Sequence, residues 1–283
     1  MNKKYARLSV LLENITIMRD VGVTKDLWEE FSAIMYHWLM WFTLGNQDIK
    51  LRYRRSSLGP FWITLSMAVT ITALGFLYSR LFNVDLQFYL PYLAISLICW
   101  TLISTLIIES CNAYVEAENF IRNQQSAFSI YIMRLLLRNI IIFAHNILVF
   151  IPIAIIYSVS LSWHVLLIIP GFILLGINAM LWGGVLAVLG TRYRDFTQIA
   201  ASLVQVIFFM TPIMWMPSFL NGQHQWLILY NPFNQLLNLI RNPMLNQDIG
   251  LQAWGIVGLM TVAGFCLYIY FMRKYKYRIV FWL

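Results

Sequence analysis

The sequence predicts an all-α polytopic membrane protein with six transmembrane helices, and three observations support this class. The chain of 283 residues is 60% hydrophobic and only 11% charged, whereas soluble domains carry roughly 25% charged residues. Six apolar runs approach or exceed the roughly 20 residues of helix that cross a bilayer core of about 30 Å. Lysine and arginine gather in the segments on one side of these runs.

We expect the chain to divide into three parts. Residues 1–58 form a cytoplasmic arm with an amphipathic interface helix, residues 59–272 form the six-span domain, and residues 273–283 form a cytoplasmic tail. The spans are expected at about 60–82, 89–111, 134–158, 164–189, 196–217 and 251–272.

Residues 26–44 predict a helix that lies on the cytoplasmic surface of the membrane. Asp26 and Glu29 have the spacing of a capping box at its start. The uninterrupted apolar part, residues 31–44, has about 14 residues and is too short to cross a bilayer. Its tryptophans suit the headgroup level. The alternative is a short core helix packed on the spans.

The charge distribution predicts the orientation of the chain. With the N-terminus inside, 18 of the 20 lysines and arginines lie inside, and only Arg80 and Arg241 lie outside. The positive-inside rule therefore predicts a multi-pass protein of the cytoplasmic (inner) membrane with both termini in the cytoplasm. This placement accounts for the positive net charge better than nucleic-acid binding does. Glu109, the one acidic residue well inside an apolar run, is expected to snorkel or to pair with Arg134 or Arg138.

The longest outer loop, residues 218–250, predicts short helices before the last span. Asn231 and Pro232 resemble a helix start, with Asn as the cap and Pro as the first helical residue. Apolar residues then recur at helical spacing until Pro243. Such a helix is too short to span, so we expect re-entrant or outer-surface helices, which membranes tolerate only where protein or water covers the backbone.

Four strings occur in a fixed order: RYRRSSLGPFW from Arg52, TRYRDF from Thr191, TPIMW from Thr211 and NPFNQLLNLIRNPML from Asn231. Together they resemble the permease (transmembrane) subunit of type-two ABC exporters of lipid-linked polysaccharide, above all the O-antigen and lipopolysaccharide export family. Capsule and teichoic acid exporters are close relatives. The resemblance covers about residues 27–275. One departure is Asn246, because the family leads us to expect a glycine soon after the last string.

The resemblance implies a homodimer in membrane lipid, with two copies of a separate cytoplasmic ABC ATPase subunit and a lipid-linked polysaccharide as substrate. The residues support this division of labour, because the sequence has no G-x-x-x-x-G-K-[S/T] phosphate loop. Its four histidines show no metal-ligand spacing. We therefore expect a transporter permease rather than an enzyme, with no metal or cofactor and with ATP hydrolysis on the partner.

Two candidate sites lie beside the first span. Arg52, Arg54 and Arg55 are candidates for binding the phosphates of the lipid carrier, because guanidinium binds phosphate in bidentate fashion. The alternative is that these arginines only fix the topology. Residues 58–60, which are Leu58, Gly59 and Pro60, are the candidate gate or hinge, because Gly and Pro break the helix between a surface helix and a membrane entry.

Two further sets are candidates for coupling and for the polymer path. The first cytoplasmic loop is expected to form a coupling helix that contacts the ATPase through Glu116, Glu118, Asn119, Phe120 and Ile121; a solvated loop is the alternative. Aromatic rings have an apolar face, and Tyr and Trp also have a polar group, so rings in the outer halves of the spans are candidates for a sugar path. They are Phe76, Tyr78, Trp100, Phe208, Phe209 and Trp215. The alternative is that these rings face lipid.

Two other classes of membrane protein are alternatives to an exporter. A membrane-bound glycosyl- or phosphoryl-transferase acting on lipid-linked sugars would need clustered acidic residues at a membrane surface. In the loops between the spans, Glu116 and Glu118 are the only near pair. A secondary transporter often shows half-repeats with interrupted helices and buried ionisable residues, and no such repeat is visible. A neighbouring gene for an ATPase would favour export.

Overall fold

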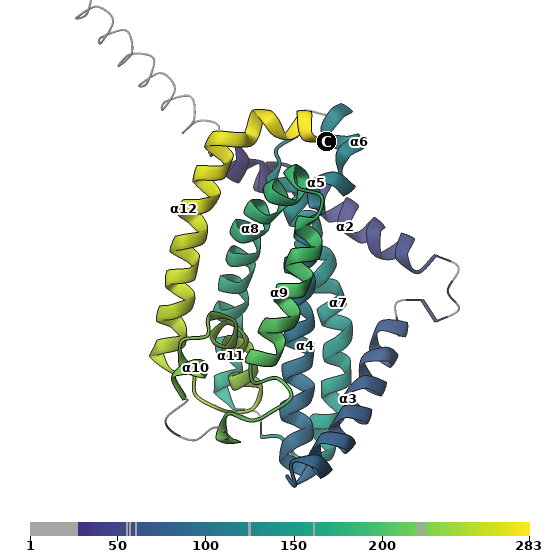
Figure 1. The fold of residues 1–283 in the computed structure, drawn as a ribbon. Helices are drawn as coiled ribbons and strands as arrows, with labels where there is room; N and C mark the ends of the chain where they lie inside the picture. Colours follow the sequence, from purple (N-terminus) through teal and green to yellow (C-terminus); the bar gives the residue numbers. More distant parts are fainter. Residues whose placement is uncertain are drawn as a thin grey trace, which may run out of the picture.

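A computed structural model describes residues 28–54, 56, 58–59, 61–123, 126–160, 162–219, 222 and 225–283. Within these ranges the chain folds into α-helices and short 3₁₀ turns, without a strand. The predicted all-α class is confirmed (Figure 1).

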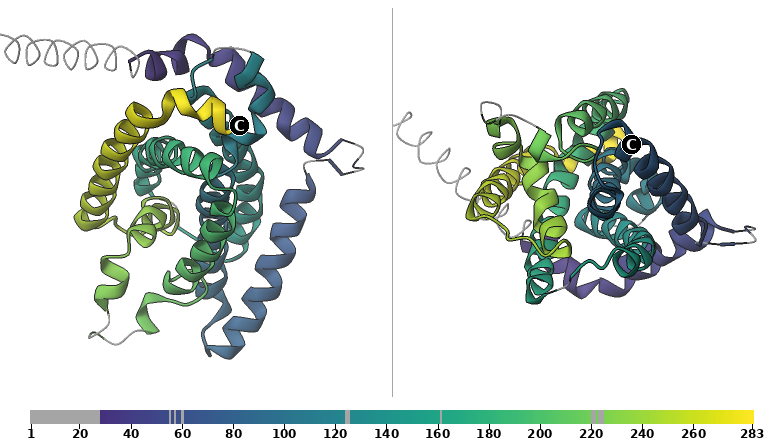
Figure 2. Two further views of the ribbon diagram at one scale, coloured as in Figure 1. Left: turned by 45° about the horizontal axis from the view of Figure 1, so that its top comes forward. Right: turned by 90° about the horizontal axis from the view of Figure 1, so that it is seen from below.

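Five helical segments in the described ranges are long and apolar enough to cross a membrane. They are α3 (Phe61–Leu81), α4 (Leu86–Ser110), α7 (Ser129–Ile156), η1 with α8 (Trp163–Leu167 and Ile168–Arg192) and α12 (Leu251–Trp282). In the end-on view of Figure 2 the helix α4 lies inside the bundle, and α3, α7, α8 and α9 pack against it. This arrangement confirms a polytopic membrane protein.

The helix α9 (Phe196–Met210) is shorter than the fifth span predicted at 196–217. Its 15 residues extend about 22 Å, which is less than the bilayer core of about 30 Å. The helix stops because Pro212 disfavours helical backbone at the residue before it, and Thr211 is extended with ψ of 135°. The predicted boundary was wrong, and the count of six spans stays a prediction.

The chain after α9 is irregular but well bonded. The Tyr92 hydroxyl donates to the Pro212 carbonyl at 2.7 Å, and the Tyr89 hydroxyl donates to the Met214 carbonyl at 2.5 Å. Arg241 Nη1 also donates to the Pro212 carbonyl, at 2.6 Å. These bonds satisfy backbone groups that water would otherwise have to reach.

The segment between α9 and α12 forms η2 (Pro217–Phe219), α10 (Gln225–Leu229) and α11 (Pro232–Met244). The predicted start of α11 is confirmed, because the Asn231 side chain accepts from the backbone N–H groups of Phe233 and Asn234 at 3.0 and 3.3 Å. The helix packs against α4, α8 and α12. Asn246 has φ of +56°, a conformation that Gly favours and Asn tolerates, which accounts for Asn where a glycine was expected.

The predicted surface helix is longer than expected and is broken. Residues 28–36 are helical, a turn follows at His37, and α2 runs from Trp38 to Arg52. Figure 1 shows α2 crossing the end of the bundle obliquely. It packs on α7 at Gly45, where a Cβ would lie 3.1 Å from the Arg134 carbonyl. The capping residue Asp26 lies outside the described residues.

The outward side of this segment keeps the features expected of a membrane-surface helix. Its exposed apolar side chains are Trp28, Met35, Tyr36, Trp38, Leu39, Phe42 and Leu51. Since the other side packs on α7, the segment combines the surface-lying arrangement with the alternative of packing on the spans.

The largest of the other differences from the predicted boundaries are at the start of α7 and at the end of α12. The helix α7 starts at Ser129, ahead of residue 134, and α12 continues to Trp282 instead of ending near residue 272. The end of α12 bends across the same end of the bundle as α2 (Figure 1). It is held there because the Arg192 guanidinium lies over the rings of Tyr275 and Trp282 at 5.4 and 5.3 Å.

Candidate functional site

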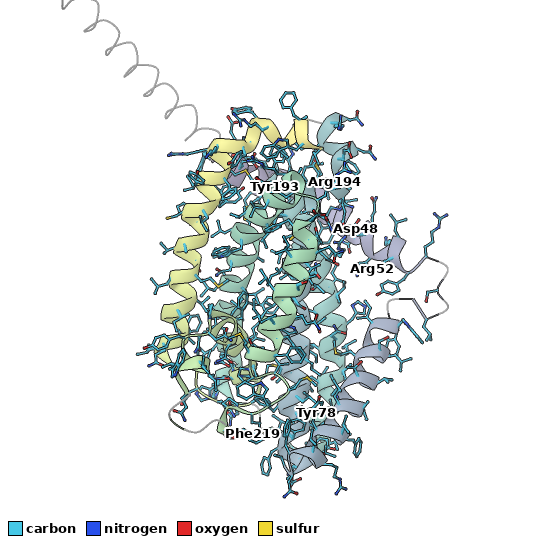
Figure 3. The ribbon with its side chains drawn as sticks, in the orientation of Figure 1. Asp48, Arg52, Tyr78, Tyr193, Arg194 and Phe219 are labelled. Carbon is cyan, nitrogen blue, oxygen red and sulfur yellow. The ribbon has the colours of Figure 1, made fainter. Side chains whose placement is uncertain are left out.

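A buried ion pair attaches α2 to the bundle. Arg134 of α7 donates from Nε and Nη2 to the two carboxylate oxygens of Asp48, at 2.8 and 2.6 Å. Arg138, one helical turn further along α7, donates to the same carboxylate at 3.4 Å. The side chains of Asp48 and Arg138 are only 10% exposed. Figure 3 places Asp48 and Arg52 along α2 as it crosses this end of the bundle.

Arg138 also contacts two further elements. Its Nη2 donates to Glu109 of α4 at 2.9 Å, and its Nη1 lies 3.5 Å from Glu116 of α5 (Ala113–Glu116). Asn139 donates to Glu109 at 2.7 Å, and Arg52 at the end of α2 donates to Glu109 at 3.2 Å. The predicted pairing of Glu109 with Arg138 is confirmed.

We call this set the arginine network; it comprises Asp48, Arg52, Glu109, Glu116, Arg134, Arg138 and Asn139. Its three carboxylates balance its three guanidinium groups, as buried charges require. The network joins α2, α4, α5 and α7 through hydrogen-bonded charges. A displacement of any one of these elements therefore strains the contacts of the others.

A second carboxylate secures the segment before α2. Glu30 is 1% exposed, and its side chain accepts from the backbone N–H of Ser129 at 3.0 Å. The amino group of Lys276, near the end of α12, lies 3.0 Å from the same carboxylate. A negative charge at the start of α7 is favoured by the helix dipole. Glu30 therefore ties the surface segment to α7 and α12.

The candidate hinge is only partly described, since Pro60 lies outside the described residues. Gly59 has φ of +55°, and an added Cβ would meet no atom within 4 Å. Glycine is therefore favoured here by backbone conformation and not by packing. Leu58 beside it is 48% exposed. A hinge role for this segment stays a prediction.

The three candidate phosphate ligands are not equivalent. Arg52 is engaged with Glu109 in the arginine network. Arg54 is exposed and makes no ion pair with any residue in the described ranges. Arg55 lies outside those ranges. Of the two described arginines in this set, Arg54 is therefore the one whose guanidinium makes no ion pair with a described residue. Phosphate binding stays a prediction.

The candidate coupling segment is helical, as expected of a coupling helix, and forms α5 and α6 (Glu118–Asn123). Glu116 belongs to the arginine network, and Glu118 pairs with Arg122 at 2.8 Å. Asn119 is exposed, whereas Phe120 is half-buried, with the Arg134 guanidinium 6.0 Å from its ring centre.

The apolar side chain exposed on this segment is not one of the two expected to contact the ATPase, Phe120 and Ile121. Ile121 is only 7% exposed and packs in the core of this chain. Val115, which the sequence analysis did not single out, is 46% exposed. The exposed face of the segment therefore combines Val115 with Glu116 and Asn119.

The candidate aromatic residues separate into two groups. Trp100 packs on Phe208, Phe208 packs on Phe209, and the Trp215 indole donates to the Phe209 carbonyl at 3.3 Å. On α3, Phe76 is 55% exposed and Tyr78 stacks on Phe82. Figure 3 shows Tyr78 and Phe219 at the end of the bundle away from Asp48.

Burial distinguishes the aromatic candidates further. Trp100 is 6% exposed, so its ring belongs to the core of this chain rather than to an open path. Phe209 is 65% exposed. The six candidate rings therefore form two separate groups with one buried member, and a polymer path along them stays a prediction.

Two residues of these sites were missed by the sequence analysis. Asp48 could have been found as a single acidic residue within a largely apolar helix, which suggests a buried partner. Arg241 was counted only as an outer positive charge, but it is 3% exposed and bonded to Tyr92, Ser96, Asn234 and Asn238. Within the described residues no three His, Cys, Asp or Glu side chains group so that they could hold a metal ion.

These features define a multi-pass α-helical membrane protein with a surface helix linked to the bundle by buried charges. The chain belongs to the ABC-2 type transporter family, because the sequence model of that family matches residues 40–245.

Relatives of this chain include the O-antigen export system permease protein RfbA of Klebsiella pneumoniae. It is 21% identical over 247 residues, which cover 83% of this chain and 91% of the relative. A protein of the same description from Myxococcus xanthus is 21% identical over 174 residues, covering 61% of this chain and 66% of the relative.

Proposed function

We propose that this chain is the permease subunit of an ABC exporter that moves lipid-linked polysaccharide of the O-antigen type across the cytoplasmic membrane. The single observation that carries the proposal is its family membership over residues 40–245, together with similarity to O-antigen export permeases over 83% of the chain. A separate cytoplasmic ATPase subunit supplies the energy. The transferase alternative is not favoured by these relatives.

The pore forms between two copies of the chain. Both α3 and α9 pack on α4, and both carry exposed apolar side chains, among them Phe76 and Phe209. This supports an arrangement in which α3 and α9 of each copy face a shared path. Exposed rings offer weak contacts at several points, which lets a long polymer enter and also leave, as ions do in channels.

The ATPase docks at the end of the bundle that carries α2, α5, α6 and the end of α12. This end is cytoplasmic, in keeping with 18 of 20 lysines and arginines on the inner side. Movement of α5 reaches Arg138 through Glu116 and passes to α2 through Asp48. The helix α2 then moves α3 through the segment that contains Gly59, and Arg54 binds carrier phosphate at this entry.

A deletion strain tests the proposal. In cells that make such a polymer, loss of this gene should remove the surface polymer while full-length lipid-linked polymer accumulates inside. The wild-type gene should restore the surface polymer, and the tagged permease should co-purify with the ATPase encoded nearby. A transferase would instead yield polymer that is shortened or missing inside the cell. That outcome, or unchanged surface polymer, contradicts the proposal.

A further inference from the structure

A cavity of about 550 Å³ lies between α10, α11 and the start of α12, at the end of the bundle away from the arginine network. Carboxamide side chains dominate its polar lining: Gln225, Asn234, Gln235, Asn238, Gln247 and Gln252. No Asp, Glu, His or Cys is among the described residues that line it. We propose that this cavity binds saccharide units of the exported polymer on the outer side, an inference that rests on the proposed function.

The floor of the cavity is fixed in orientation. Arg241 Nη2 donates to the side-chain oxygens of Asn234 and Asn238, at 3.3 and 2.6 Å. Asn238 donates to the Gln235 side-chain oxygen at 3.2 Å, and Gln235 donates to the Leu229 carbonyl at 2.6 Å. Each amide oxygen therefore has an assigned partner, and the floor is organised before any ligand arrives.

Arg241 gives this floor its electrostatic character. It is 3% exposed, and its bonded partners in the described chain are all neutral, including the Tyr92 hydroxyl at 2.8 Å and the Pro212 carbonyl at 2.6 Å. A buried positive charge polarises the hydrogen bonds around it. The cavity therefore favours ligands that present oxygen atoms, and it favours those with acidic substituents over neutral ones.

The amide groups at the mouth of the cavity are available for a ligand. Gln225, Gln247 and Gln252 are exposed, and their side chains make no hydrogen bond with any described residue. A carboxamide offers two N–H donors and a carbonyl acceptor, which matches adjacent sugar hydroxyls that both donate and accept. A fixed floor below free amides at the mouth is suited to holding a sugar ring.

The location of the cavity indicates what saccharide binding there would do for export. The cavity includes Tyr92 of α4 and Pro217, so it adjoins the irregular segment that follows α9. A saccharide held here would keep the emerging polymer from sliding back while the cytoplasmic side resets. Binding at one such point must stay weak, because export requires release.

The test measures binding and export with the same variants. The permease with its ATPase is placed in lipid nanodiscs and titrated with an oligosaccharide of one repeat unit, released from the host polymer, by saturation-transfer NMR. The triple variant Gln225→Leu, Gln247→Leu and Gln252→Leu should bind at least about tenfold more weakly, because it lacks up to three hydrogen bonds. These side chains are exposed, so the fold is preserved. Gln87→Leu is the matched control, since Gln87 is exposed at the same end but does not line the cavity.

The outcomes separate this inference from the proposed function. Saccharide binding that the triple variant loses and the control keeps supports the inference. A wild-type complex that does not bind the oligosaccharide overturns it, and so does a triple variant that binds normally. The proposed function fails instead if deletion of the gene leaves surface polymer unchanged, a result that does not depend on the binding assay.

Discussion

Arg134 holds Asp48 in a bidentate ion pair, with N···O distances of 2.8 and 2.6 Å, between helices α7 and α2. The pair is largely buried, so it attaches the surface helix firmly to the bundle. Arg138 extends the attachment to α4 and α5. The helix that leads to the first span and the segment expected to contact the ATPase therefore share one set of charges.

The first prediction concerns this network. Arg138→Gln leaves Asp48, Glu109 and Glu116 without one of their shared partners, and breaking a buried pair typically costs about 3–5 kcal/mol. The purified variant should unfold at a clearly lower temperature and should lose export. Arg122→Gln is the control, because its pair with Glu118 is exposed and worth at most about 1 kcal/mol. Equal melting temperatures for Arg138→Gln and the wild type would argue against a stabilising network.

The second prediction concerns Gly59. With φ of +55° and open space around an added Cβ, only backbone conformation limits substitution. Gly59→Val should reduce export, because a β-branched residue is strained in this region, whereas Gly59→Asn should retain most of it. Export is compared at matched protein levels and matched ATPase binding. Equal export by the Val and Asn variants would rule out a need for this conformation.

The third prediction concerns the polymer path. Phe209→Ala and Trp215→Ala should each slow export modestly. The double variant should slow it more than additively if both rings line one path, because the Trp215 indole bonds to the Phe209 backbone and so lies next to that residue. Phe265→Ala is the control, since Phe265 is exposed on α12, which packs on α8 and α11. The rate of surface-polymer appearance after induction is the measurement. If all four variants match the wild type, the rings face lipid.

The fourth prediction concerns the ATPase contact. Val115→Asp puts a charge on the exposed apolar residue of α5 and should sharply reduce co-purification of the ATPase. If Val115 is a hot spot, the variant should lose more than about 2 kcal/mol of binding free energy. Glu118→Lys should weaken the complex in a salt-dependent way, as expected of a rim charge. Gln87→Leu, at the opposite end of the bundle, should have no effect. A full yield of complex from both α5–α6 variants would move the contact to α2 or to residues 192–195.

The sequence predicted what depends on local pattern. The presence of the apolar helices α3 and α4 follows from apolar runs, and the cap of α11 follows from Asn231 and Pro232. Pro212 also indicates an early end of α9 at Thr211. The prediction extended the span beyond this point because the residues around Pro212 are apolar.

Other features depend on tertiary contacts and could not be predicted in this way. The partners of Asp48 lie 86 and 90 residues away, and no local spacing indicates such a pair. The burial of Trp100 results from rings on α9 and α11. Ile121 is buried and Val115 is exposed because α5 and α6 fold as two short helices against the bundle.

ATP-dependent transport into inverted membrane vesicles tests the central claim most directly. Vesicles that contain this chain and its ATPase receive labelled lipid-linked polysaccharide on their outer, cytoplasmic face, and the polymer that becomes resistant to an added glycan hydrolase is measured. We predict protection that requires ATP, the ATPase and this chain, and that Arg138→Gln abolishes. Protection without ATP or without this chain, or a change in polymer length in place of protection, would contradict the account.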